Sequence, residues 1–431
     1  MPQYLTPGVY VEEVMEGTRP IEGVGTNVAA FIGRADNLEA PVGVPLAVNN
    51  WTQYRTIFGG EGPSSDLTLA VHGFFLNGGQ RCYVLNIGKN GSVAGTSSQP
   101  GIDKFGTIDE IAIVAAPGET DAVSLEAVIS HCESMQDRVA VLDFPQGITD
   151  LNTLTRPATV TGPTSSSSSG SSGSSADGAA SDAEGASDAE GAEAPPPASP
   201  ARRGAPGAPT EEGNASRETD WAAQYGPYIW IVDPVTGKLV LAPPSGHVAG
   251  VWARVDGSRG VHKAPANEIV RGAVGLEYAL TSSEQGLLNS SGINAIRMIN
   301  GGIRIWGART RAGSASPWKY LPVRRLFAFA EESIQQGTNW VVFEPNDRTL
   351  WNLLRRDVIA FLRRLWSDGA LFGATEREAF FVKCDAETNP PENIDAGILT
   401  ALVGMAPVKP AEFIVFKVSQ YVAGSAGGEE A

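Results

Sequence analysis

The stretch PPSGHVAGVWARVDGSRGVHKAPAN, Pro243 to Asn267, is the most distinctive segment of the 431-residue chain. Three glycines before Gly260, three prolines, one tryptophan and two histidines fall within these 25 positions. Glycine and proline at this density are typical of tight turns and of places where two backbones approach closely. The sequence therefore predicts either a catalytic loop or a rigid packing corner here.

A catalytic loop finds little support once chemical roles are assigned to its residues. Ser245 lacks the glycine two positions earlier that a G-x-S-x-G nucleophile elbow requires. His247 and His262 are 15 residues apart, with no cysteine or carboxylate at metal-ligand spacing. We interpret both histidines as structural and predict no catalytic, cofactor-binding or metal-binding residues. The alternative is an α/β hydrolase-like enzyme that uses Ser245 or Asp256 with one of the two histidines.

The same stretch resembles a block of the contractile tail sheath proteins, the family that surrounds the tubes of contractile phage tails, R-type pyocins and related injection particles. Other blocks resemble the same family in the same order, and the chain is identified as a member over about residues 5–145 and 220–420. These blocks are LTPGVYVEEV (Leu5–Val14), TNVAAFIGRA (Thr26–Ala35), NGGIRIWGARTR (Asn300–Arg311), WVVFEPND (Trp340–Asp347), AFFVKCDAETNP (Ala379–Pro390) and PAEFIVFKVSQ (Pro410–Gln420).

The resemblance implies a structural function. Such subunits polymerise as a helical sheath around an inner tube and contract to drive the tube through a target envelope, with baseplate and cap proteins as further partners. The energy is stored at assembly in a metastable lattice, so no cofactor is expected. An undivided sheath with one flexible insertion fits a phage tail or a phage-like extracellular contractile injection system better than a type VI secretion sheath, which is divided between two proteins. The expected particle is the injection system, and the alternative is a contractile phage tail or R-type pyocin. Assembly is expected in the bacterial cytoplasm, into a phage tail-like particle that can be released.

Bulk properties agree with a cytoplasmically made structural protein. The net charge of −16 argues against nucleic-acid binding, which needs a basic face. No run of 18 apolar residues could span a membrane, and MPQYLTPGVYVEEV has no basic or apolar region of a secretory signal. Cys82, Cys132 and Cys384 are far apart and odd in number, which favours reduced thiols.

A long polar segment interrupts the chain after Pro163. Residues 164–175 are almost pure serine and glycine, and the stretch up to Ser216 carries eight acidic residues against Arg202 and Arg203, a net charge of −6. Such a segment cannot bury enough apolar surface to offset the entropy of ordering. We therefore predict a disordered surface insertion where larger sheath proteins carry extra folded domains.

The two flanks of this insertion predict one interrupted α/β domain. Glu110–Gly118 and Arg138–Pro145 are short apolar runs, and Asp121 opens a helical pattern to about Met135 between them. This order predicts a β-α-β unit with parallel strands. Tyr228–Val232 and Leu239–Ala242 predict a hairpin, whose TGKL turn lacks the pattern of a phosphate-binding loop.

An amphipathic helix from Thr349 carries the most specific prediction. Its apolar stripe comprises Trp351, Leu354, Val358, Phe361, Leu362 and Leu365. Four arginines against Asp357 give this stretch a local charge of +3. The pattern alone is compatible with a solvated basic face on a core helix. Because sheath proteins grip the acidic wall of the tube with a basic helix, the resemblance implies tube binding by Arg356, Arg363 and Arg364.

Both ends of the chain are predicted to be terminal strands. Val9 and Val11 alternate with Tyr10 and Glu12, and Phe413–Val418 is an apolar run before a Gly-, Ala- and Glu-rich tail. Strands without a hairpin partner present open edges that can pair with another chain, although they could also complete the chain's own sheet. Sheath arms pair with neighbouring subunits, so the resemblance implies inter-subunit contacts by Val9, Tyr10, Val11, Phe413, Val415 and Phe416.

The expected fold class is mixed α/β (α+β), a sheath-type fold with extended N- and C-terminal strand arms and a disordered surface insertion. The expected organisation is an N-terminal arm (1–22), the first part of the sheath domain (23–160), the insertion (161–217), the second part of that domain (218–325), a C-terminal sheath domain with the tube-facing helix (326–411), and a C-terminal arm and tail (412–431).

Overall fold

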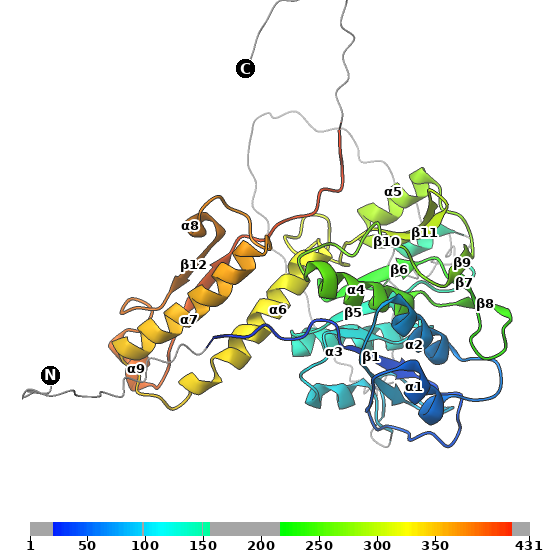
Figure 1. Cartoon of the computed structure of the whole chain (residues 1–431), viewed down its shortest axis with the longest axis horizontal. Helices are drawn as coiled ribbons and strands as arrows, with labels where there is room; N and C mark the ends of the chain where they lie inside the picture. The colour runs from blue at the N-terminus through cyan, green and yellow to red at the C-terminus, as the bar shows by residue number, and fades with distance from the viewer. Residues whose placement is uncertain (1–19, 97–98, 149, 156–215, 416–431) are drawn as a thin grey trace, which may run out of the picture.

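The computed structural model describes residues 20–96, 99–148, 150–155 and 216–415 (Figure 1). Their mixed α/β architecture forms two bodies with separate apolar cores. The larger body holds the strands of one wide sheet, and the smaller body is built around two long helices. Most of the predicted insertion and the first 19 residues of the predicted N-terminal arm lie outside the described residues.

One sheet organises the larger body, with strand order β11-β10-β6-β5-β4-β1-β3-β2. The six strands from β10 to β3 are mutually parallel, and the edge strands β11 and β2 are antiparallel to their neighbours. Central strands of a parallel sheet are covered on both faces, which explains their continuous apolar sequences. The strands are β1 (Ala29–Gly33), β2 (Leu46–Val48), β3 (Cys82–Asn86), β4 (Ile113–Ala115), β5 (Val139–Asp143), β6 (Ala222–Gly226), β10 (Ile293–Ile299) and β11 (Gly302–Trp306).

The predicted β-α-β unit is present. Helix α3 (Ala122–Met135) begins after Asp121, whose side chain accepts hydrogen bonds from the backbone N–H groups of Val123 and Ser124. Strands β4 and β5 pair in parallel on either side of this crossover. The predicted hairpin is also present, as β7 (Ile229–Val232) and β8 (Leu239–Ala242) in a small sheet with β9 (Ala273–Leu276).

Further helices cover the larger body. Helices α2 (Asp66–Asn77) and α4 (Ser245–Arg259) pack against each other and contact the central strands. The remaining elements of this body are α1 (Trp51–Phe58), η1 (Ile102–Thr107), η2 (Leu151–Thr155) and α5 (Ser282–Ser290).

The smaller body contains the predicted amphipathic helix, α7 (Arg348–Ser367), beside α6 (Leu321–Gly337). All six residues of the predicted apolar stripe are buried in its core. Shorter elements complete it: η3 (Asn339–Val341), α8 (Glu376–Ala379), β12 (Phe380–Lys383), α9 (Pro391–Asp395) and β13 (Leu402–Met405), with β12 and β13 antiparallel.

Helix α6 belongs to both cores. Leu321 and Ala328 pack into the larger one, whereas Leu326 and Ala330 pack into the smaller one. The expected domain boundary between residues 325 and 326 therefore falls inside a continuous helix.

The N-terminal segment bridges the two bodies. Ile21 is fully buried in the smaller core, and the chain then runs beside α6 towards β1 (Figure 1). The backbone N–H of Val24 donates to Ser333 Oγ (3.1 Å), and Arg325 donates to the carbonyl of Thr26 (3.1 Å). Residues 20–22 of the predicted arm are thus part of the folded subunit.

Two expectations need correction. The signature stretch is mainly a helix, because Ser245–Arg259 is helical and mostly buried, and a turn is found only beyond it, at Val261 and His262. The predicted strand at Phe413–Val418 is not seen in its described part, since residues 413–415 have no regular secondary structure. A strand requires a hydrogen-bonded neighbour, and the single chain offers none to these described residues.

Candidate functional site

The glycines of the signature stretch allow α4 to approach α2 closely. A Cβ on Gly246 would lie 2.2 Å from the carbonyl oxygen of Ala70, and one on Gly250 would lie 2.5 Å from that of Phe74. Real Cβ atoms do not approach backbone this closely. The expected close backbone approach is therefore confirmed, although between two helices rather than at a turn.

Ser245 and His247 do not form a catalytic pair. The Ser245 hydroxyl donates to Asp143 Oδ2 (2.6 Å), and its backbone N–H donates to Oδ1 (2.7 Å). Neither ring nitrogen of His247 has a hydrogen-bond partner within the described residues, and its ring lies against Gly73. Burial lowers the pKa of His247 to about 3, so the ring is a neutral packing group.

Asp256 and His262, the other catalytic candidates of the hydrolase alternative, also have structural roles. Asp256 pairs with Arg325 of α6, and the two side chains are 2% and 3% exposed. His262 lies just beyond the end of α4, and burial lowers its pKa as well. No group of three or more His, Cys, Asp or Glu side chains in the described part of the chain could hold a metal ion.

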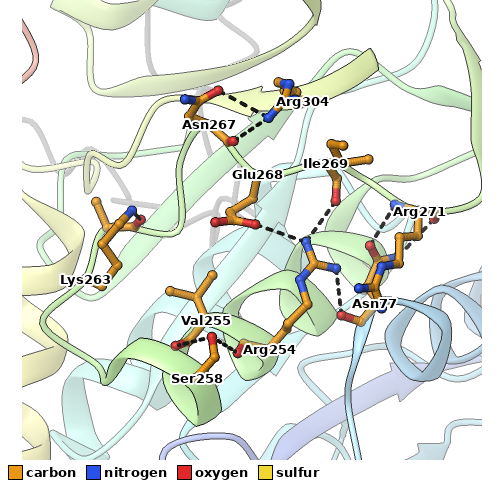
Figure 2. Close-up of polar contacts among 11 residues, drawn as sticks. Asn77, Arg254, Val255, Ser258, Lys263, Asn267, Glu268, Ile269, Arg271 and Arg304 are labelled. Atoms are coloured by element: carbon orange, nitrogen blue, oxygen red, sulfur yellow. Dashed lines mark hydrogen bonds and ion pairs between the residues drawn. The ribbon is translucent and has the colours of Figure 1, made fainter. Parts of the chain in front are cut away.

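The loop that follows α4 is fixed by a network of polar contacts (Figure 2). Arg254 donates to the carbonyls of Asn77 (2.9 Å) and Ile269 (2.9 Å) and pairs with Glu268. The Asn77 side chain bonds both the carbonyl and the N–H of Arg271. These contacts attach the loop to the end of α2 and to Arg254 within α4, so the signature stretch serves packing.

Helix α7 presents its arginines away from the buried stripe. The side chains of Arg356 and Arg363 are 41% and 54% exposed. Arg356 Nε donates to Asp357 Oδ1 (3.2 Å), the neighbouring residue on the same helix. The structure thus places these two guanidinium groups at the surface of the smaller body.

Arg363 has a partner that the sequence did not point to. Its Nε donates to Glu376 Oε1 (2.6 Å) and its Nη2 to Oε2 (3.1 Å). This two-bond pairing raises the pKa of Arg363 and lowers that of Glu376. Both groups face water, so the pair is weak and open to exchange with an external carboxylate.

Arg364 differs from Arg363, although the two are adjacent. Its guanidinium donates to the backbone carbonyl of Ile21, at the start of the described chain. It therefore ties α7 to the N-terminal segment. Local sequence holds no signal for this contact, because the two residues are 343 positions apart.

The predicted arm residues are only partly described. Val9, Tyr10, Val11 and Phe416 lie outside the described residues, whereas Phe413 and Val415 are 76% and 78% exposed. Directly before them, Glu412 pairs with Arg309 of the larger body. Sequence reasoning missed this pair, because 103 positions separate the two residues.

Comparison with protein-family models places two matches end to end. Residues 91–311 match the phage tail sheath protein central domain, which is half of the chain, and residues 314–420 match the phage tail sheath C-terminal domain. The chain belongs to the phage tail sheath protein family. Its members are structural, so this sheath protein is not an enzyme.

Curated relatives of the sheath protein are tail sheath proteins of phages. That of Burkholderia phage BcepMu is 30% identical over 214 residues, which cover 47% of this chain and 44% of the relative. The tail sheath protein of Salmonella phage ViI is 28% identical over 188 residues, which cover 42% of this chain and 28% of the relative. The matches thus span less than half of the length of these relatives.

Solved structures extend the likeness to the whole sheath protein. The sheath of the PVC extracellular contractile injection system, in its contracted state, has a TM-score of 0.73 and 28% identity, and the match covers 98% of this chain and 99% of the other. The contracted helical sheath of the anti-feeding prophage has a TM-score of 0.69 and 27% sequence identity. That match covers 97% of this chain and 100% of the other. These matches confirm the sheath-type fold expected from the sequence.

Proposed function

We propose that this protein is the sheath subunit of an extracellular contractile injection system. It polymerises as a helical sheath around an inner tube and contracts to drive that tube through a target envelope. The observation that carries the proposal is the end-to-end match with the PVC sheath, which leaves almost no part of either chain unmatched. The phage relatives match over less than half of their length.

The architecture of the described residues suits a subunit that moves as rigid pieces. Each body has its own core, and a buried ion pair joins α4 to α6 where the bodies meet. Packed cores switch between discrete arrangements rather than deforming continuously. Contraction therefore repacks subunits against each other, and the energy comes from the lattice formed at assembly.

Tube binding is assigned to Arg356, Arg363 and Arg364 of α7, on an acidic tube wall. Arg356 and Arg363 are exposed on the face opposite to the buried stripe, as a contact with another protein requires. A single charge pair at a water-exposed surface is weak. Repetition of the contact in every subunit would still fix the sheath on the tube. Arg364 would act through the N-terminal segment that it holds.

The chain ends are assigned to contacts between subunits. Val9, Tyr10 and Val11 at one end and Phe413, Val415 and Phe416 at the other would pair with neighbouring copies and keep them connected during contraction. Structures of the anti-feeding prophage include its baseplate, so a baseplate protein is a further proposed partner, with a cap protein at the other end. The domain limits expected from the sequence remain part of this proposal, except the limits at 22/23 and 325/326, which fall within the folded N-terminal segment and within α6.

A contractile phage tail or R-type pyocin is the alternative particle. The test is to isolate the particles that contain this chain from the cells that produce it and to image them by cryo-electron microscopy. Tube-filled sheaths without a capsid exclude a phage tail, and cargo density inside the tube supports an injection system over an R-type pyocin. Particles with capsids would point to a phage, and a compact oligomer without sheath would overturn the proposal.

A further inference from the structure

Arg309 joins the last described residues of the chain to the larger body. Its Nε donates to both carboxylate oxygens of Glu412 (3.0 and 3.2 Å), its Nη2 donates to Oε2, and its Nη1 donates to the carbonyl of Asn289 (2.8 Å). The side chains of Arg309 and Glu412 are only 11% and 17% exposed. A planar guanidinium bonded in this way fixes the orientation of the carboxylate as well as its position.

The arginine itself is held rigidly. Asn294, a fully buried residue of β10, accepts from the backbone N–H of Arg309 (2.8 Å) and donates to its carbonyl (2.8 Å). Arg309 also forms a backbone bridge with Tyr320. The backbone of Arg309 is therefore anchored to the sheet by contacts that do not involve Glu412.

The segment that reaches this arginine comes from the smaller body. Val408 still bonds the backbone of Ala370 (3.1 Å), and four residues later Glu412 meets Arg309. Immediately afterwards Phe413, Ile414 and Val415 are 74–78% exposed. Three consecutive large apolar side chains that are exposed among the described residues are typical of a protein–protein interaction site.

We propose that the Arg309–Glu412 pair is an anchor that fixes the direction in which the C-terminal segment leaves the subunit, and so presents Phe413–Val415 to a second copy of this chain. A segment with a fixed start loses less conformational entropy when it pairs with a neighbour. The inference rests on the proposed function of the C-terminal arm, and it adds Arg309 and Glu412 as positioning residues for assembly.

The test measures direction and assembly separately in the full-length chain with Glu412→Ala. Spin labels on Ser283→Cys and Val415→Cys report the distance between α5 and the C-terminal segment, and the three native cysteines are buried. The unsubstituted pair should give a narrow distance distribution, and Glu412→Ala should broaden it. Sheath recovered by sedimentation should fall about tenfold, with unchanged circular dichroism and at most a small shift in the melting temperature.

Glu110→Ala is the matched control, because Glu110 forms an ion pair with Arg81 next to other strands of the same sheet. It should alter neither readout. An unchanged distance distribution in Glu412→Ala would overturn the anchor, and a broad distribution with normal sheath yield would overturn its role in assembly. If the unsubstituted chain forms no sheath at all, the proposed function fails, while the distance measurement still decides the anchor.

Discussion

Arg325 of α6 and Asp256 of α4 form an ion pair that is almost completely removed from water, with the guanidinium lying over the ring of Trp252 at 4.7 Å. One of its nitrogens also donates to the carbonyl of Thr26 in the N-terminal segment. The Arg325 guanidinium thus joins α6 to α4 and to the N-terminal segment. Removal of one partner would leave the other buried and uncompensated.

We expect Asp256→Ala to lower the free energy of unfolding of the subunit by about 3–5 kcal/mol. Urea unfolding followed by circular dichroism measures it. Glu387→Ala breaks the exposed pair with Lys383, which water screens, and should lower the free energy of unfolding far less. Equal effects of the two substitutions would contradict the role assigned to burial.

Two glycines of one helix should respond in opposite ways to alanine. Gly250→Ala drives a methyl group against the Phe74 carbonyl of α2, so we expect a loss of about 1–3 kcal/mol or failure to fold. A Cβ on Gly257 meets nothing within 4 Å, so Gly257→Ala should stabilise the protein by about 0.4–1 kcal/mol. Thermal unfolding of the two variants provides the comparison. A stable Gly250→Ala subunit would disprove the tight packing of α2 on α4.

Asp143 should make stability fall as the pH rises. Burial raises the pKa of its carboxyl from 3.8 to about 7, against the hydrogen bonds from Ser245 and Gly118. The folded state therefore binds an extra proton between about pH 4 and 7, and this contribution to stability is lost as the pH rises through 7. From pH 5 to pH 8 we expect a loss of about 2–3 kcal/mol.

Comparison with Asp143→Asn isolates this contribution. Burial lowers the pKa of His131 to about 4. The neutral imidazole therefore stabilises the fold above about pH 6.5, and this contribution is lost as the pH falls, which is opposite to the effect of Asp143. The difference between the two proteins removes such shared effects. If wild type and Asp143→Asn show the same change in unfolding free energy between pH 5 and 8, Asp143 is not the group responsible.

The double variant Arg356→Glu with Arg363→Glu should fail to assemble around the tube and still fold, because neither side chain lies on the buried stripe. Co-sedimentation with the tube protein measures the loss, and circular dichroism checks the fold. Arg55→Glu with Lys104→Glu gives the same change of charge on exposed residues of the larger body. Tube-filled particles from the first variant would refute the assignment of α7.

Glu376→Gln should have the reverse effect. It frees Arg363 from its internal partner, so tube binding should strengthen and persist to higher salt. The measurement is the salt concentration at which half of the sheath leaves the tube. A midpoint that does not move would show that Arg363 makes no contact with a tube carboxylate.

Much of the fold could be predicted from sequence where the signal is local or repeated. Alternation and turns located the β7–β8 hairpin, apolar runs around a capped helix located the β-α-β unit, and a 3.6-residue period located α7 with its buried stripe. The signature stretch misled because glycine in a window signals a turn. In α4 those glycines instead make room for another helix, which no local pattern records.

The arginine surface of α7 could be predicted only in part, because local pattern does not show long-range contacts. Helical periodicity shows that Arg356 and Arg363 lie off the apolar stripe, but it cannot show that Arg363 meets Glu376 or that Arg364 holds Ile21. Those contacts depend on how distant segments fold back on α7. Tertiary structure alone shows that one of two adjacent arginines pairs with Glu376 and that the other bonds the N-terminal segment.

Within residues 20–415, as far as the structure describes them, the chain crosses between the two bodies at residues 20–28, at the entry to α6 and at residues 408–412. Cleavage of any one crossing therefore leaves two others in place. A protease nick near Pro317 would not separate the bodies without denaturant, although it would break the covalent path between them. The two bodies are thus tethered redundantly, and a force applied at residue 20 or residue 415, the ends of the described chain, reaches both cores.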